Sequence, residues 1–132
     1  MDYLYNFGNH VFDTIKSKTI ILNNIKAGSN ENTLTIDVNE ASINYDLEVS
    51  GNNNIGRIDI TYKNNTTPDA GIIASISYPT AYTNKPCVII TSNTQNVYLT
   101  TNVLNDYFEV YATETLAQNM TISFSYMIID LD

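Results

Sequence analysis

The chain has 132 residues, enough for one domain with a hydrophobic core and too few for two. Hydrophobic residues make up 43% and charged residues 15%, which is typical of a folded protein and excludes a disordered tail. The formal net charge of −8 argues against polyanionic partners, so we expect neither nucleic-acid binding nor attachment to an anionic membrane surface.

Residues 1–18 carry many aromatic side chains but no clear periodicity. Tyr3, Tyr5 and Phe7 alternate, and Phe12 follows in a loosely helical spacing. So many rings on a short segment are hard to hide in a core of their own. Two interpretations stay open: an arm that docks on the surface of a partner protein, or a first strand packed on its own domain.

Residues 19–50 change to short strands. Apolar and polar residues alternate in Leu34–Val38 and again in Ile43–Val49, after a shorter strand that begins near Ile20. A period of two predicts half-buried strands with one face in water. Because a pair of such strands is only marginally stable alone, we expect a shaft or trimerisation region that needs a partner sheet or neighbouring chains.

Residues 51–132 are predicted to form a separate head domain, because Gly51–Asn54 is the clearest turn signal in the chain. Cys87–Ile90 is apolar at every position, so we expect this strand to be buried on both faces. Short strands at this spacing predict an all-β fold, an antiparallel β-sandwich of the jelly-roll type. The predicted strands of the head are Ile58–Tyr62, Ile72–Tyr78, Cys87–Ile90, Val97–Leu99, Phe108–Ala112 and Thr121–Leu131.

The last predicted strand, Thr121–Leu131, has apolar residues on both faces near its end. Its first half alternates apolar and polar residues, but Met127, Ile129 and Leu131 make the second face apolar as well. Such a strand belongs in the centre of a sheet, and its second face needs cover from another sheet or another copy of the chain. Symmetric self-association supplies that cover most simply.

Catalytic and metal-binding patterns are missing from the sequence. His10 is the only histidine, so no triad with a histidine base can form, and no second ligand is spaced to hold a metal with it. No glycine-rich phosphate loop or Cys/His metal motif occurs. We therefore expect no catalytic residue, cofactor or metal, and predict that the protein is not an enzyme. Cys87, the only cysteine, is interpreted as a small buried hydrophobic residue.

Acidic residues alternate along two of the predicted strands. Asp37, Glu40, Asp46 and Glu48 could place oxygen atoms near one Ca²⁺ ion. Alternating acidic residues on an exposed strand face are more often solvated, and we interpret these four in that way.

Tyrosine dominates the aromatic residues, with ten tyrosines, four phenylalanines and no tryptophan. Tyr78, Tyr82, Tyr107 and Tyr111 lie at strand ends or near loops. Because tyrosine combines contact area with a polar tip, these four are candidates for glycan contact. Strand residues with a hydroxyl group in water are the alternative interpretation for each.

No apolar stretch approaches the length of a membrane span, and the first residues lack the basic segment and apolar core of a signal peptide. We therefore expect no membrane insertion. If the protein acts outside a cell, it is expected to leave by another route.

Several short motifs follow one another in a recognisable order. They are a glycine-led strand at Gly56–Ile58, Ile76–Pro79 leading to Pro86–Ile90, a Phe-x-Val strand at Phe108–Val110 and a closing Phe-x-Tyr-x-Ile strand at Phe124–Ile128, preceded by Asn32–Ile36 and Ile43–Gly51. This order resembles the C-terminal head domain of phage and viral fibres with its shaft-to-head passage. The resemblance covers residues 32–132, with two departures. Leu116–Asn119 stands where that group has a glycine-rich loop, and the chain is very short for a long tail fibre.

The resemblance implies a homotrimer whose β-sandwich heads pack around an axis on a virion, with Met127, Ile129 and Leu131 in the trimer interface. Residues 1–18 would be the arm that docks on a capsid or tail protein. Because the chain is very short for a long tail fibre, the resemblance favours a short fibre, a spike or a capsid-decorating structural protein. Such a protein would be made in the host cytoplasm without a signal peptide, and its head is a candidate for binding a host-surface glycan or protein.

Two other classes stay open. One is a carbohydrate-binding module or lectin-like β-sandwich that acts as a monomer, with the Tyr78–Tyr82 and Tyr107–Tyr111 regions as its binding surface. The other is a secreted trimeric jelly-roll ligand of cell-surface receptors, against which the missing signal peptide and disulfide count.

Overall fold

The computed structural model describes residues 32–39, 44–64, 67 and 69–131, which form eight strands and no helix. The predicted docking arm, with Tyr3, Tyr5, Phe7 and Phe12, and the predicted strand near Ile20 lie outside the described residues. The strands are β1 Thr35–Val38, β2 Tyr45–Gly51, β3 Ile55–Tyr62, β4 Gly71–Ser77, β5 Cys87–Ser92, β6 Leu99–Val103, β7 Tyr107–Ala112 and β8 Thr121–Ile129.

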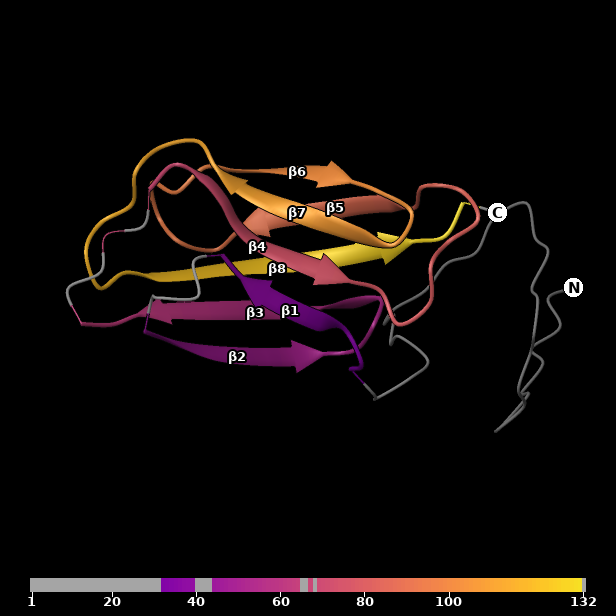
Figure 1. Ribbon diagram of the computed structural model, residues 1–132, viewed down its shortest axis with the longest axis horizontal. Helices are drawn as coiled ribbons and strands as arrows, with labels where there is room; N and C mark the ends of the chain where they lie inside the picture. The colour runs from indigo at the N-terminus through magenta and orange to yellow at the C-terminus, as the bar shows by residue number, and fades with distance from the viewer. Residues whose placement is uncertain (1–31, 40–43, 65–66, 68, 132) are drawn as a thin grey trace, which may run out of the picture.

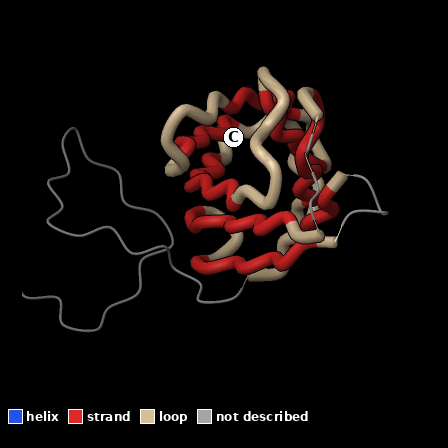
Figure 2. The backbone as a smooth tube through the Cα atoms, turned by 90° about the vertical axis from the view of Figure 1, so that its left-hand side faces the viewer, coloured by secondary structure: helices blue, strands red, loops and turns tan. Residues whose placement is uncertain are grey.

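The strands form two four-stranded sheets in which every neighbouring pair is antiparallel. Sheet A has the order β1-β4-β7-β6, and sheet B has the order β2-β3-β8-β5. Sheet A lies in front of sheet B in Figure 1, and the turned view in Figure 2 separates the two layers. The predicted all-β sandwich of antiparallel strands is therefore confirmed.

The connectivity is less regular than that of a jelly roll. A jelly roll passes from one sheet to the other at nearly every connection. Here β2 and β3 form a hairpin within sheet B, and β6 and β7 form one within sheet A. The strand order of the described residues therefore supports a β-sandwich without the strict jelly-roll connectivity.

Alternation along the central strands builds one core between the sheets. From β8 the core receives Ile122, Phe124, Tyr126 and Ile128, each at most 2% exposed. Because successive residues of a strand point to opposite faces, a row of this kind fills the space between two sheets. Burying each large side chain contributes roughly 1.5–3 kcal/mol. From sheet A the same core receives Ala74, Ile76, Phe108 and Val110.

The predicted boundary at Gly51 is wrong for the described residues. β1 pairs with β4 from Thr35 opposite Ser77 to Val38 opposite Ala74, so it belongs to sheet A. β2 pairs with β3 along its whole length and belongs to sheet B. The described residues before Gly51 are therefore part of the same sandwich as those that follow it, and Gly51–Asn54 closes a hairpin inside this sandwich.

The prediction that Cys87–Ile90 is buried on both faces is also wrong. β5 is an edge strand of sheet B, and Ile89 is 50% exposed on its outer side. Val88 and Ile90 pack partly against the core, and Cys87 is half-buried. An apolar residue on the outer face is left open because no described segment covers that side.

Tyr126 of β8 adds a buried side-chain contact to the turn of the β2–β3 hairpin, beside the backbone pairing of β3 with β8. The hydroxyl of Tyr126 donates to the carbonyl oxygen of Asn52 and accepts from Nδ2 of Asn32 at 3.0 Å. Its ring needs Gly56 beside it, because a Cβ at that position would lie 2.6 Å from the Tyr126 hydroxyl oxygen and 2.2 Å from the carbonyl oxygen of Ser50. Tyr126 therefore joins the start of the described chain to the turn, and the backbone N–H of Ile128 adds a bond from β8 to the carbonyl oxygen of Asn54 in the same turn.

We expect Tyr126→Phe to lower the free energy of unfolding by about 1–3 kcal/mol, because the buried carbonyl group of Asn52 loses its hydroxyl donor. Urea unfolding at neutral pH measures the change. Tyr98→Phe is the matched control: Tyr98 is 68% exposed, and its loss of a hydroxyl should change stability by less than about 0.5 kcal/mol. Equal effects of the two substitutions would contradict this role for Tyr126.

Candidate functional site on the outer face of sheet B

The outer face of sheet B carries an exposed row of large apolar side chains. Ile55 of β3 pairs with Met127 of β8, and Met127 pairs with Ile89 of β5, so the three lie side by side across the sheet. Ile129 follows two residues further along β8, opposite Cys87. The exposed fractions are 38% for Ile55, 50% for Ile89, 40% for Met127 and 38% for Ile129. We call Ile55, Ile89, Met127 and Ile129 the apolar patch.

A shallow hollow of about 270 Å³ lies within this face. It is lined by Ile55, Ile89 and Met127 together with backbone or small polar groups, and no lining residue carries a charge. Large apolar side chains gathered around an uncharged hollow are more typical of a protein contact surface than of a solvated strand face. The remaining lining residues are Gly56, Thr91, Ser125 and Tyr126.

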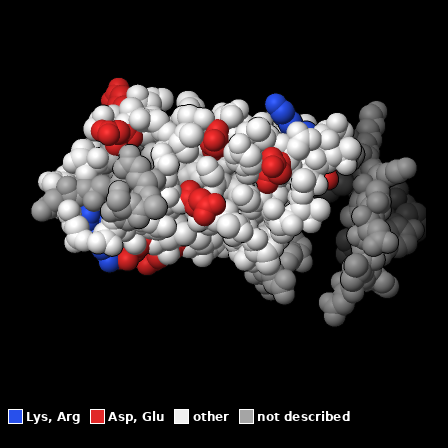
Figure 3. All heavy atoms as spheres, in the orientation of Figure 1, with Lys and Arg blue, Asp and Glu red and all other residues white. Residues whose placement is uncertain are grey.

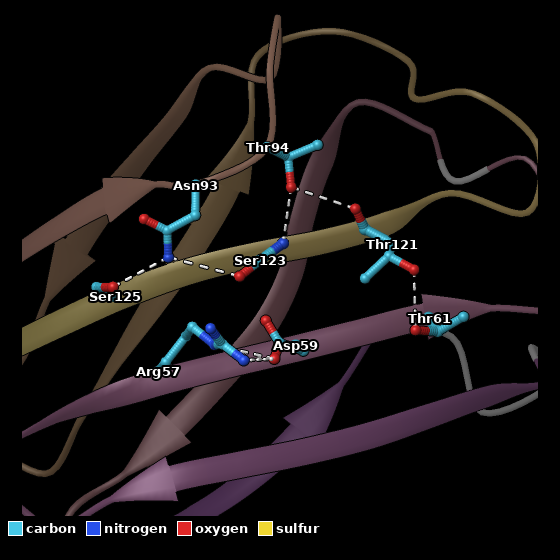
Figure 4. A network of polar contacts seen from close by, with 8 residues as sticks. All are labelled: Arg57, Asp59, Thr61, Asn93, Thr94, Thr121, Ser123 and Ser125. Carbon is cyan, nitrogen blue, oxygen red and sulfur yellow. Dashed lines mark hydrogen bonds and ion pairs between the residues drawn. The ribbon is translucent and has the colours of Figure 1, made fainter.

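The other half of the same face is polar (Figure 4). Arg57 and Asp59 of β3 form an ion pair, with Nη2 of the arginine 2.9 Å from Oδ2 of the aspartate. Nδ2 of Asn93 donates to the Ser125 hydroxyl oxygen at 3.0 Å. Further contacts of this network join the hydroxyl groups of Thr61 and Thr121 at 3.0 Å and the backbone N–H of Ser123 to the hydroxyl oxygen of Thr94 at 2.9 Å.

The outer face of sheet B therefore has an apolar half and a polar half, and this determines what kind of surface it can bind. Many of the polar side chains bond to one another within the chain, which lowers the cost of removing them from water when a partner covers them. Arg57 is neutralised by its neighbour on the same strand. An apolar centre beside a polar margin is the usual anatomy of a protein–protein interface.

The predicted trimer-interface residues Met127, Ile129 and Leu131 are all exposed, with Leu131 at 67%. β8 is a central strand, as its two apolar faces predicted. Sequence reasoning missed Ile55, which stands alone between Asn54 and Gly56 and joins the patch only through its pairing with Met127. Whether a second copy covers these residues stays a prediction.

Tyr78, one of the four predicted glycan contacts, is buried and therefore does not offer its ring to a glycan. It is 7% exposed and packs edge-on against Tyr82, with ring centroids 4.9 Å apart, and stacks on Phe108 at 6.0 Å. Its buried hydroxyl has no hydrogen-bond partner among the described residues. Burial raises the pKa of Tyr78 far above its usual value, and the nearby Tyr82 and Asp106 raise it further.

Tyr82 is half-buried and lines a hollow of about 380 Å³ at one end of the sandwich. The hollow lies where the β2–β3 turn, the β4–β5 loop and the chain after β8 meet. Burial raises the pKa of Tyr82, and the carboxylate of Asp130 adds to the effect. The other residues that line this hollow are Asn53, Asn54, Pro79, Thr80, Ala81, Thr83 and Asp130.

Tyr107 and Tyr111 lie elsewhere, on the outer face of sheet A. Both are half-buried residues of β7 that alternate with the buried Phe108 and Val110. The structure therefore separates the four predicted glycan contacts into a buried residue, one wall of an end hollow and a pair on a sheet face.

The acidic residues considered for Ca²⁺ do not converge. Asp37 is in β1 of sheet A, whereas Asp46 and Glu48 are in β2 of sheet B. Asp46 instead pairs with the ammonium group of Lys63. Glu40 lies outside the described residues, within which no group of three or more His, Cys, Asp or Glu side chains is arranged to hold a metal.

Comparisons with known proteins give no identification: no protein family, curated protein or solved structure matches this chain. Within the described ranges, no helix is long and apolar enough to cross a membrane. Function therefore has to be inferred from the residues and their geometry.

We expect Tyr78→Phe to leave the protein as stable as the wild type at neutral pH, or to stabilise it by up to about 1 kcal/mol. The reason is that a buried hydroxyl without a partner is removed while both ring contacts remain. Chemical unfolding of the two proteins side by side measures this. A loss of stability above about 1 kcal/mol would show that the hydroxyl is hydrogen-bonded.

A pH dependence follows from the raised pKa of Tyr78. A group whose pKa is higher in the folded state stabilises the fold below its unfolded value of 10.0, and that contribution is lost as the pH rises further. The urea midpoint of the wild type should therefore fall above about pH 10. The urea midpoint of Tyr78→Phe should fall less steeply with pH. It should still fall to some extent, because burial also raises the pKa values of Tyr82 and Tyr126. If the urea midpoints of the two proteins fell equally with pH, the raised pKa of Tyr78 would be contradicted.

Proposed function

We propose that this protein is a non-enzymatic structural protein that associates with further copies of itself through the outer face of sheet B. The observation that carries the proposal is the apolar patch, four large side chains that the described residues leave open to water. Monomeric soluble proteins rarely expose contiguous apolar surface beyond what they use for binding. The polar margin beside the patch is already hydrogen-bonded within the chain.

A second copy of the chain is the occupant that the charges favour. Each copy carries a formal net charge of −8, so two copies repel one another over most of their surfaces. The apolar patch contains no charged residue, and Arg57 beside it is paired with Asp59. This is therefore a region where two acidic copies can approach with little repulsion.

The size of the face is adequate for such a contact. With nine residues in β8 and four strands side by side, the face measures roughly 30 Å by 20 Å. Its outline of about 600 Å² approaches the ~800 Å² that each partner contributes to a standard interface. Leu131, which is 67% exposed, extends the apolar surface beyond β8.

The virion role and the number of copies rest on the resemblance to viral fibre heads. On that basis we propose a homotrimer that serves as a short fibre, spike or capsid-decorating protein, held to the particle by residues 1–18. The β-sandwich fold fits this role but is shared by many unrelated proteins, so it does not distinguish a virion protein from a secreted trimeric ligand. A carbohydrate-binding role is supported separately, by the tyrosine residues on the outer face of sheet A.

We predict a mass close to three times 14.8 kDa for the purified chain in solution. Ile89→Lys should shift the protein to the monomer mass, because a charge would have to be buried in the centre of the interface. Light scattering coupled to size-exclusion chromatography, over a hundredfold range of concentration, measures both.

Thr35→Lys is the matched control, since Thr35 is an exposed strand residue on the opposite sheet. It should leave the mass unchanged. A wild-type monomer at every concentration would refute self-association, and an assembly that survives Ile89→Lys would refute the chosen face. A dimer would retain the face but refute the trimer.

The virion role needs a separate test on intact virus particles purified from cells that produce this chain. We expect electron cryo-microscopy to show residues 1–18 against capsid or tail subunits and the sandwich outside the particle surface. Particles that lack the chain entirely would refute the role while leaving self-association open.

A further inference from the structure

The outer face of sheet A differs in chemistry from the outer face of sheet B. Its middle row runs across all four strands as Asp37, Ser75, Glu109 and Asn102, in the order β1, β4, β7 and β6. The two flanking rows each hold a tyrosine of β7. Tyr107 stands opposite Ser77, and Tyr111 stands between Ile72 and Thr100. We call Asn102, Tyr107, Glu109 and Tyr111 the tyrosine face.

Hydrogen bonds fix the centre of the tyrosine face. The hydroxyl of Tyr111 donates to Oε2 of Glu109 at 2.7 Å, and Nδ2 of Asn102 donates to the same oxygen at 3.1 Å. These two donors lower the pKa of Glu109, so the side chain is ionised at neutral pH. Glu109 lies on the same face of β7 as Tyr107 and Tyr111, because the three residues alternate with the buried Phe108, Val110 and Ala112.

The negative charge of the surface around the tyrosine face argues against an anionic ligand there. Figure 3 shows the side of the molecule on which sheet A lies, and separate acidic groups are spread over it between broad uncharged regions. A ligand that carries negative charge would be repelled by these carboxylates and by the net charge of the protein. A protein partner would be expected to meet a more apolar centre, as the apolar patch on sheet B provides.

We propose that the tyrosine face binds a neutral oligosaccharide. Sugar hydroxyl groups can donate to the Glu109 carboxylate, while the rings of Tyr107 and Tyr111 offer apolar surface for the faces of the sugar rings. The two tyrosines are four residues apart on one strand, about 13 Å, a distance that calls for several linked sugars rather than one. This inference goes beyond self-association and does not depend on it, because the two faces are on opposite sheets.

Isothermal titration calorimetry of the full chain with soluble sugars tests the inference. The probes are maltohexaose, cellohexaose, chitohexaose and a galactose-terminated N-glycan, with a heparin hexasaccharide as the anionic comparison. We expect at least one neutral probe to bind and heparin not to bind. Tyr111→Ala and Glu109→Gln should each weaken that binding about tenfold. Glu109→Gln keeps the shape of the side chain, so it reports on binding even if Tyr111→Ala lowers stability.

Ile89→Lys is the control on the opposite sheet. It should bind the neutral probe with the affinity of the wild type, because Ile89 lies on the outer face of sheet B and the tyrosine face lies on sheet A. The soluble probe reports the affinity of each site whether or not the chains associate. Failure of all four neutral probes to bind would overturn the inference, as would unchanged affinity in both Tyr111→Ala and Glu109→Gln. Loss of binding in Ile89→Lys would also overturn it, because the site would then lie on sheet B. A monomer that binds sugar refutes only the assembly, and a trimer that binds none refutes only this inference.

Discussion

The contact between the two sheets across the row Ile122, Phe124, Tyr126 and Ile128 is the constraint on which the rest of the structure depends. These side chains are almost completely buried and lie on the central strand of sheet B. Since successive residues of a strand point to opposite faces, burying this row forces Met127 and Ile129 outward. The apolar patch is thus tied to the core: β8 cannot slip by one residue without exchanging its buried and exposed rows.

Pairing with neighbouring strands turns two outward residues into a surface. β3 places Ile55 on one side of Met127, and β5 places Ile89 on the other. Each of these residues alone would be an ordinary exposed apolar side chain. Together, next to a polar region whose groups bond to one another, they form a face that another protein surface can cover at little desolvation cost.

The sandwich therefore offers two outer faces with different chemistry. Sheet B presents apolar side chains at one end, whereas sheet A presents a carboxylate held by a tyrosine and an asparagine between two aromatic rings. If both proposals hold, one face serves assembly and the other remains accessible for a ligand. Such a division lets several copies present the same binding surface, which increases the strength of attachment to a surface that carries many sugars.

Local patterns in the sequence were sufficient for much of the fold. The predicted strands Ile58–Tyr62, Phe108–Ala112 and Thr121–Leu131 correspond to β3, β7 and β8. The period of two in the last of them marked β8 as a central strand with a second apolar face. The same local reasoning failed for Cys87–Ile90, because an apolar run shows that a strand could be buried on both faces but not that anything covers it. It also failed at Gly51–Asn54, where a turn signal looks the same inside a domain as between domains.

What the sequence by itself determined is most of the strands, the inward row of β8 and the small fraction of charged residues, since these depend on composition and on neighbours within a few residues. The predicted strand Val97–Leu99 was misplaced, because β6 runs over Leu99–Val103. Only the tertiary structure decided which strands meet. The pairing of β1 with β4, the burial of Tyr78 and the meeting of Ile55, Met127 and Ile89 each join residues far apart in the chain. Register across a sheet is set by packing of the whole core, and no short stretch of sequence contains that information.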